Sequence, residues 1–123
     1  MADGWERAVP LEELEEARPR RIEVDNTEAL VVRNGEALYA IGLRCTHQGA
    51  PLDRGVLHLT GSPLTVTCPA HGSMFDLTDG QVRRGPAMHP VTAFDVRVVD
   101  GIVEVRPRTY PTRSSRARCP RAT

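Results

Sequence analysis

The chain has 123 residues, and its 16 basic and 16 acidic side chains give a formal net charge of zero. This length suits one domain with a modest core, and no stretch approaches the roughly 20 apolar residues of a membrane-spanning helix. The first ten residues lack a basic flank followed by an apolar run, so no secretory signal is expected and a cytoplasmic location is favoured.

Short strands separated by turns are predicted along most of the chain, because Val and Ile alternate with polar residues in several runs. A helix of at most two turns is expected at 10–19, ending at Pro19. Strands and hairpins are then expected at 20–25, at 28–42 with a turn at Asn34–Gly35, at 63–68, at 74–82 around Asp79–Gly80, and at 93–106 around Asp100–Gly101.

About eight short strands without intervening helices predict an antiparallel all-β sandwich or barrel. Segments 43–62 and 83–90 contain Gly and Pro and are expected to be loops that carry the site. The domain is expected to occupy residues 1–106, with a cluster-binding part at about 43–90. The tail, 107–123, is rich in Arg, Ser and Pro and is predicted to be disordered.

Charge is unevenly distributed along the chain. Residues 1–106 carry 11 Arg and 16 acidic residues, whereas the tail carries five Arg and no acid. An acidic run near the amino terminus is either a solvated face or a docking surface for a basic partner. Its members are Glu12, Glu13, Glu15 and Glu16.

Two loops each combine one Cys with one His. Cys45 and His47 form C-x-H, and Cys68 and His71 form C-x-x-H. Structural zinc sites usually pair C-x₂₋₄-C with H-x₃₋₅-H, so the mixed loops are atypical of zinc. They fit better a [2Fe–2S] centre in which two His replace two Cys on one iron, because each loop then supplies one ligand to each iron.

The remaining Cys and His residues lack a partner at the spacing of these motifs. His58 and His89 are expected to be exposed residues that bind no metal. Cys119, in the tail, is expected to be a spare thiol, because a structural disulfide is disfavoured in a reducing compartment.

The segments CTHQGAPLDRG and CPAHGSMFDLTDGQVRRGPAMHPVTAFDVRV resemble the Rieske iron–sulfur domain, and in particular Rieske-type ferredoxins, over about residues 4–106. The resemblance implies one Rieske [2Fe–2S] cluster. Cys45 and Cys68 would bind its inner iron, and His47 and His71 its outer, more exposed iron. It also implies that the segment GPAMHP covers the cluster from a third side.

Several neighbouring residues are expected to surround such a cluster. Gly49 and Gly72 would let backbone N–H groups approach the sulfides. The hydroxyl of Ser73 could reach a bridging sulfide, and Pro86 would lie in the covering loop.

The resemblance also bears on the reduction potential. In the Rieske proteins of quinol-oxidising complexes, the family pattern has two disulfide-forming Cys where this chain has Ala50 and Ala70. The same proteins have Tyr at the position of Phe75, and Phe cannot donate a hydrogen bond to a cysteine sulfur. We therefore expect a potential in the lower part of the Rieske range of about −150 to +300 mV.

The resemblance implies a soluble one-electron carrier between a flavin-dependent ferredoxin reductase and a terminal oxygenase, and not an enzyme. A monomer that binds neither a membrane nor a specific nucleic acid is expected. Two alternatives stay open: a small Rieske-like subunit of assimilatory nitrite reductase, and a structural Cys₂His₂ zinc module.

Overall fold

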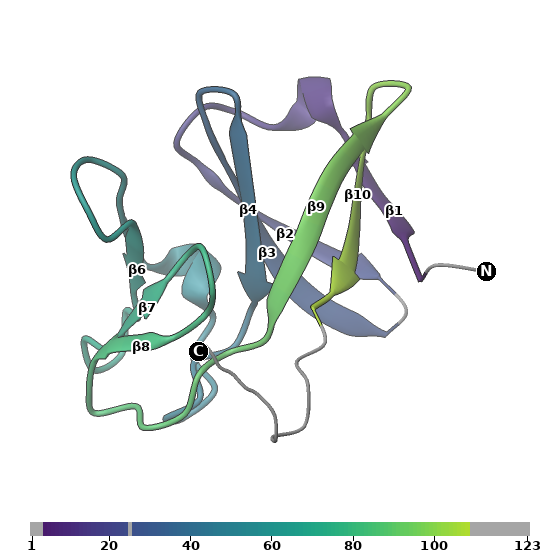
Figure 1. Ribbon diagram of the computed structural model, residues 1–123. Helices are drawn as coiled ribbons and strands as arrows, with labels where there is room; N and C mark the ends of the chain where they lie inside the picture. The colour runs from purple at the N-terminus through teal and green to yellow at the C-terminus, as the bar shows by residue number, and fades with distance from the viewer. Residues whose placement is uncertain (1–3, 25, 109–123) are drawn as a thin grey trace, which may run out of the picture.

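The computed structural model describes residues 4–24 and 26–108, which form two antiparallel sheets and two short 3₁₀ helices (Figure 1). The large sheet has the strand order β1 (Glu6–Pro10), β10 (Ile102–Pro107), β9 (Ala93–Val99), β4 (Ala37–Gly42), β3 (Thr27–Asn34) and β2 (Pro19–Val24). The small sheet has the order β5 (Val56–His58), β6 (Thr65–Thr67), β7 (Met74–Asp76) and β8 (Val82–Arg84). The 3₁₀ helices are η1 (Leu11–Glu13) and η2 (Leu52–Arg54). The predicted all-β architecture is confirmed.

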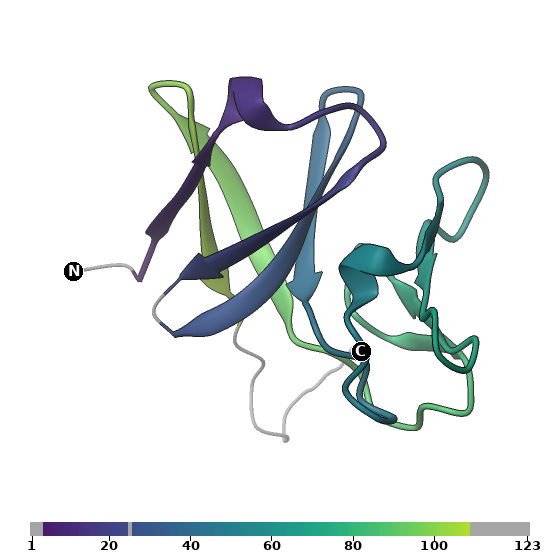
Figure 2. The ribbon, with the colours of Figure 1, turned by 180° about the vertical axis from the view of Figure 1, so that it is seen from behind.

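The large sheet curls on itself, and the small sheet lies beside it (Figures 1 and 2). The edge strands β1 and β2 come into contact, so the large sheet is nearly closed into a barrel. One apolar core fills the interior of this sheet, and a second lies between the two sheets. The second core, called the inter-sheet core below, contains both Cys45 and Cys68.

Strand β3 is the wall that the two cores share. Its residues 29–32 are four consecutive buried apolar residues, Ala-Leu-Val-Val. Successive side chains of a strand point to opposite faces, so Ala29 and Val31 enter the barrel core and Leu30 and Val32 the inter-sheet core. A strand buried on both faces explains why this segment lacks the polar alternation of an exposed strand.

The helix predicted at 10–19 is wrong. Only η1 is helical, and the chain then becomes extended from Leu14, whose side chain is buried. Glu16 forms an isolated bridge with Arg33, and the Ala17 amide donates a hydrogen bond to the Arg33 carbonyl at 2.8 Å. Pairing with β3 therefore overrides the weak local preference for a helix.

In two hairpins, the observed turn can be compared with the turn predicted from the local sequence. The turn at Asp100–Gly101 is confirmed, since Val99 pairs with Ile102. The earlier hairpin turns at Gly35–Glu36, one residue later than predicted, because Asn34 pairs with Ala37.

A contact from a distant segment stabilises the shifted turn. The Glu16 carboxylate accepts a hydrogen bond from the Gly35 amide at 2.9 Å. This acceptor lies 19 residues away in the chain, so the local sequence of the hairpin does not reveal it.

Two further boundaries differ from the sequence-based expectation. Strand β5 lies inside the segment 43–62, which was expected to be a loop. Strand β10 continues to Pro107, and Arg108 is hydrogen-bonded to the sheet, so the domain extends beyond residue 106. The rest of the predicted tail, including Cys119, lies outside the described residues.

Candidate metal centre

The first ligand loop is residues 45–50, which follow β4 and precede η2. The amide of Cys45 donates to the carbonyl of Ala50 at 2.9 Å. In return, the amide of Gly49 donates to the carbonyl of Cys45 at 2.7 Å. Gly49 has φ +80°, a conformation that glycine adopts without strain.

The second ligand loop is residues 68–73, which connect β6 to β7, and it repeats this pattern. The amide of Cys68 donates to the carbonyl of Ser73 at 2.7 Å. The amide of Gly72, with φ +83°, donates to the carbonyl of Cys68 at 3.2 Å. The two loops therefore share one backbone design, in which a Cys begins a tight turn and a Gly closes it.

The structure buries the two predicted thiols in the same core and brings the two predicted imidazoles side by side. Both thiols are buried, with 3% of each Cys exposed, and neither is in a disulfide. His47 and His71 are exposed, and their ring centroids lie 5.2 Å apart with the rings nearly perpendicular. The site thus presents two thiols on the core side and two imidazoles on the solvent side.

This arrangement fits a dinuclear cluster better than a single zinc ion. A tetrahedral zinc site requires four donors around one point. Among the described residues, no group of three or more Cys, His, Asp or Glu side chains converges on one ion position. A [2Fe–2S] cluster with two Cys and two His instead needs separate ligand pairs for its two irons, and buried thiols with exposed imidazoles provide such pairs.

The covering loop, residues 85–90, is tied to both ligand loops by hydroxyl groups. The amide of Ala87 donates to Ser73 Oγ at 2.9 Å, and Thr46 Oγ1 donates to the carbonyl of His89 at 2.6 Å. Ala87 is buried, whereas Met88, between the two anchors, is 84% exposed. Thr46 was not among the residues expected at the site, although its hydroxyl between two predicted ligands was an available signal.

The residues expected around the cluster differ in burial, and their roles toward a cluster stay predictions. Ser73 is buried and already accepts a hydrogen bond from Ala87, so its own proton is available to another acceptor. Phe75 is fully buried in the inter-sheet core. Pro86 is exposed in the covering loop. Donation from Ser73 to a sulfide stays a prediction.

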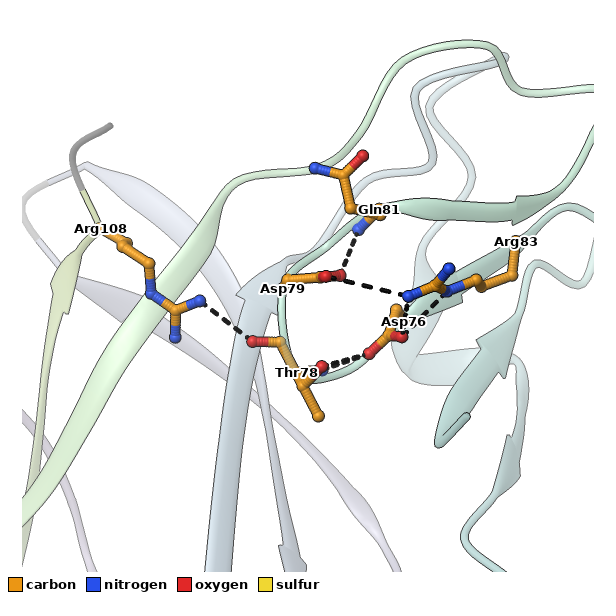
Figure 3. Close-up of polar contacts among 6 residues, drawn as sticks. All are labelled: Asp76, Thr78, Asp79, Gln81, Arg83 and Arg108. Atoms are coloured by element: carbon orange, nitrogen blue, oxygen red, sulfur yellow. Dashed lines mark hydrogen bonds and ion pairs between the residues drawn. The ribbon is translucent and has the colours of Figure 1, made fainter. Parts of the chain in front are cut away.

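A buried carboxylate stabilises the turn between β7 and β8 (Figure 3). The covering loop directly follows β8. Asp76 accepts hydrogen bonds from the Thr78 amide at 2.8 Å and from Arg83 Nε at 2.9 Å. Burial alone would raise the pKa of Asp76, but the bonds from Thr78 and Arg83 outweigh it and hold the pKa below its usual value. Asp76 is therefore ionised at neutral pH.

Arg108 joins this turn to the large sheet. Its Nη1 donates to the Thr78 carbonyl at 3.1 Å (Figure 3). Its Nε donates to the Asp95 carboxylate of β9 at 3.1 Å. Arg108 belongs to the segment that was predicted from the sequence to be a disordered tail. Its ordered role depends on a contact across 30 residues, which no local pattern reveals.

The acidic run predicted as a docking surface lies on and after η1, at the opposite end of the molecule from the ligand loops (Figures 1 and 2). Two of its four carboxylates form ion pairs within the described residues. Glu13 pairs with Arg20 and Glu15 with Arg18, both at 3.1 Å. This placement favours the solvated-face reading of the run over a docking role.

None of the helices in the described residues is long and apolar enough to cross a membrane. His58 and His89 are both exposed, as expected.

Comparisons with known proteins agree with this geometry. Residues 4–95 match the family described as the Rieske [2Fe-2S] domain. The chain is 35% identical over 94 residues to the 3-phenylpropionate/cinnamic acid dioxygenase ferredoxin subunit of Escherichia coli strain K12, covering 76% of this chain and 85% of that protein. It is also 31% identical over 96 residues to apoptosis-inducing factor 3 of Mus musculus, but it spans only 15% of that protein's length.

Two solved structures share the fold over most of the described chain. The ferredoxin of carbazole 1,9a-dioxygenase from Nocardioides aromaticivorans IC177 superposes with a TM-score of 0.77 at 37% identity, covering 83% of this chain and 96% of that one. A ferredoxin solved in a complex of reduced oxygenase and oxidised ferredoxin of carbazole 1,9a-dioxygenase gives a TM-score of 0.73 at 29% identity, covering 84% and 93%.

Proposed function

Because the chain belongs to the family of Rieske [2Fe-2S] domains, we propose that it is a ferredoxin that carries single electrons from a flavin-dependent reductase to a terminal oxygenase. Members of this family hold a Rieske-type [2Fe–2S] cluster, which takes up and releases one electron when bound. The observation that carries the proposal is the pair of matched loops, which presents two buried thiols and two adjacent exposed imidazoles.

The proposed ligands divide by their burial. Cys45 and Cys68 would bind the inner iron as thiolates, because both lie in the inter-sheet core. His47 and His71 would bind the outer iron, because both rings are exposed and adjacent. An electron could then enter and leave on the solvent side, while the core side of the site stays dry.

The partners are inferred from the similar proteins. Two of them are named as ferredoxins of dioxygenases, and one was solved together with an oxygenase. These names support an oxygenase as the acceptor in the present case, whereas the flavin-dependent reductase rests on the family resemblance alone. The same resemblance supports an electron-transfer component without catalytic residues of its own, working in the cytoplasm.

The ligand assignment is tested by comparing matched histidine variants. The purified protein should be red-brown, and its reduced form should give an EPR spectrum with the low average g-value of a His-ligated cluster. His47→Ala or His71→Ala should remove this signal, whereas His58→Ala and His89→Ala should keep it. A colourless protein, or an EPR spectrum typical of four Cys ligands, would contradict the proposal.

A further inference from the structure

The exposed surface around the proposed cluster has an unusual composition. We define the docking face as residues 46–48, 69–71 and 84–90, which are the outer parts of the ligand loops and the covering loop. The contacts between His47 and His71, and between Thr46 and the His89 carbonyl, bring these segments together. The wider segments 43–52, 68–73 and 84–92 contain no Asp or Glu, although they hold three of the four His residues.

The docking face carries an unbalanced positive charge. Arg44, beside it, forms an ion pair with Glu28 at 3.2 Å, and Arg83 is paired with Asp76 at 2.8 Å. Arg84, the last residue of β8, is exposed and has no ion-pair partner among the described residues. The one unmatched charge at this face is therefore a cation next to the covering loop.

An apolar side chain projects from the same loop. Met88 is 84% exposed, the most exposed of the large apolar side chains in the described chain. The anchors at Ala87 and at the His89 carbonyl fix the backbone on both sides of it. A flexible thioether on a fixed backbone adapts to a partner's pocket at a low ordering cost.

Together these features have the composition of a protein interface. Met, Arg and aromatic residues are enriched at such interfaces, while Lys, Glu and Asp are depleted. The surface around the site contains Met88 and Arg84, and it lacks every one of the depleted charged types. The acidic run on η1 faces the opposite end of the molecule and leaves this charge unopposed (Figures 1 and 2).

We propose that the redox partner that docks over the cluster presents carboxylates around an apolar pocket, with the pocket receiving Met88 and the carboxylates facing Arg84. This inference rests on the proposed ferredoxin function and specifies the chemistry of its partner. It differs from the docking alternative that the sequence left open, in which the acidic run of this chain would meet a basic partner. Rim charges mainly set association rates and salt dependence, while an inserted side chain mainly sets affinity.

Two well-known electron-transfer proteins serve as probes, because plastocyanin docks through an acidic face and cytochrome c through a basic one. Binding of the cluster-loaded protein to each is measured by surface plasmon resonance at low and at physiological ionic strength. We expect tighter binding to plastocyanin, which weakens as salt is added because screening reduces the attraction between charges. This binding readout does not depend on electron transfer.

Amino-acid substitutions test which residues of the docking face contact the probe protein. Arg84→Glu should weaken binding to plastocyanin about three- to tenfold at low salt, and Met88→Ala about fivefold or more at any salt. Arg7→Glu is the charge-matched control, because Arg7 is exposed on β1, away from the ligand loops, and should change binding little. Circular dichroism establishes that each variant is folded.

Three outcomes would overturn the proposed partner chemistry: tighter binding to cytochrome c, no binding to plastocyanin, or equal effects of Arg84→Glu and Arg7→Glu. In each of these cases a Rieske EPR signal from the same sample would leave the ferredoxin function intact. Absence of that signal would instead contradict the proposed function itself.

Discussion

The contact between Gly80 and Val91 provides a sharp test of how the covering loop is held. Gly80 lies in the turn between β7 and β8, and Val91 directly follows the covering loop. The Val91 amide donates to the Gly80 carbonyl at 3.0 Å. A Cβ atom on residue 80 would lie 2.2 Å from the Val91 carbonyl oxygen, far closer than any ordinary contact. Gly80→Ala must therefore push these two backbone segments apart.

Gly101 offers a matched control for the backbone conformation. Gly80 and Gly101 have nearly identical φ values of +77° and +78°, but a Cβ atom on Gly101 would meet nothing within 4 Å. Both Ala variants incur the left-handed conformational cost of about 1–2 kcal/mol. Reduced freedom of the unfolded chain offsets roughly 0.4–1 kcal/mol of this in each. The difference in the free energy of unfolding between the two variants therefore reports the steric contact of residue 80 with Val91.

The magnitude of this difference follows from two terms. Displacing packed backbone costs about 1–3 kcal/mol, and weakening the Val91 hydrogen bond about 0.5–1.5 kcal/mol. Gly80→Ala should thus be less stable than Gly101→Ala by about 2–4 kcal/mol. At roughly 4 °C per kcal/mol for a domain of this size, the melting temperatures should differ by about 8–16 °C.

The assay is thermal unfolding of the cluster-loaded protein, followed by circular dichroism and by visible absorption at one scan rate. We expect Gly80→Ala to lose its visible absorption at a lower temperature, because the displaced segment leads into the covering loop. Equal melting temperatures for Gly80→Ala and Gly101→Ala would refute the reasoning.

Two further predictions concern the surroundings of the site. Phe75→Tyr should raise the reduction potential if its hydroxyl reaches a cysteine sulfur; a net hydrogen-bond contribution of about 0.5–1.5 kcal/mol corresponds to about 20–60 mV for one electron. Redox titration measures this, and an unchanged or lower potential would contradict the assignment of Phe75. Asp76→Asn should destabilise the fold by about 1–3 kcal/mol at neutral pH, because the Asp76 carboxylate accepts bonds from Thr78 and Arg83. Since the folded-state pKa of Asp76 is lowered from 3.8, its contribution is fully present above about pH 4 and is lost as pH falls further through the folded pKa. The difference in melting temperature between wild type and Asp76→Asn should therefore shrink below pH 4, and a difference that stays constant down to pH 2 would count against this role.

The sequence by itself determined the chemistry of the site. Cys45 with His47 and Cys68 with His71 are spaced so closely that each pair must share one loop, whatever the rest of the fold does. The all-β architecture was likewise predictable, because alternation of apolar residues is a local property of each strand. The turn at Asp100–Gly101 is another local signal, and it was confirmed.

Only the tertiary structure decided what surrounds those residues. Leu14 is buried, and the Glu16 carboxylate accepts a hydrogen bond from the Gly35 amide. These tertiary contacts hold the segment after η1 in an extended conformation, where the sequence predicted a helix. Thr46 and Arg108 act through contacts that span 43 and 30 residues. Such contacts depend on how the sheets pack and leave no periodic pattern in the sequence.

Long-range packing also decides which surface surrounds the proposed cluster and would contact a partner. The sequence contains both an acidic run and an acid-free segment around the ligands, and either could have been a docking surface. The fold places the acidic run at the far end of the molecule. Hydrogen bonds tie the covering loop, which contains Met88 and directly follows Arg84, to both ligand loops. Charge and residue type are local properties, but the face on which they lie is decided by long-range packing.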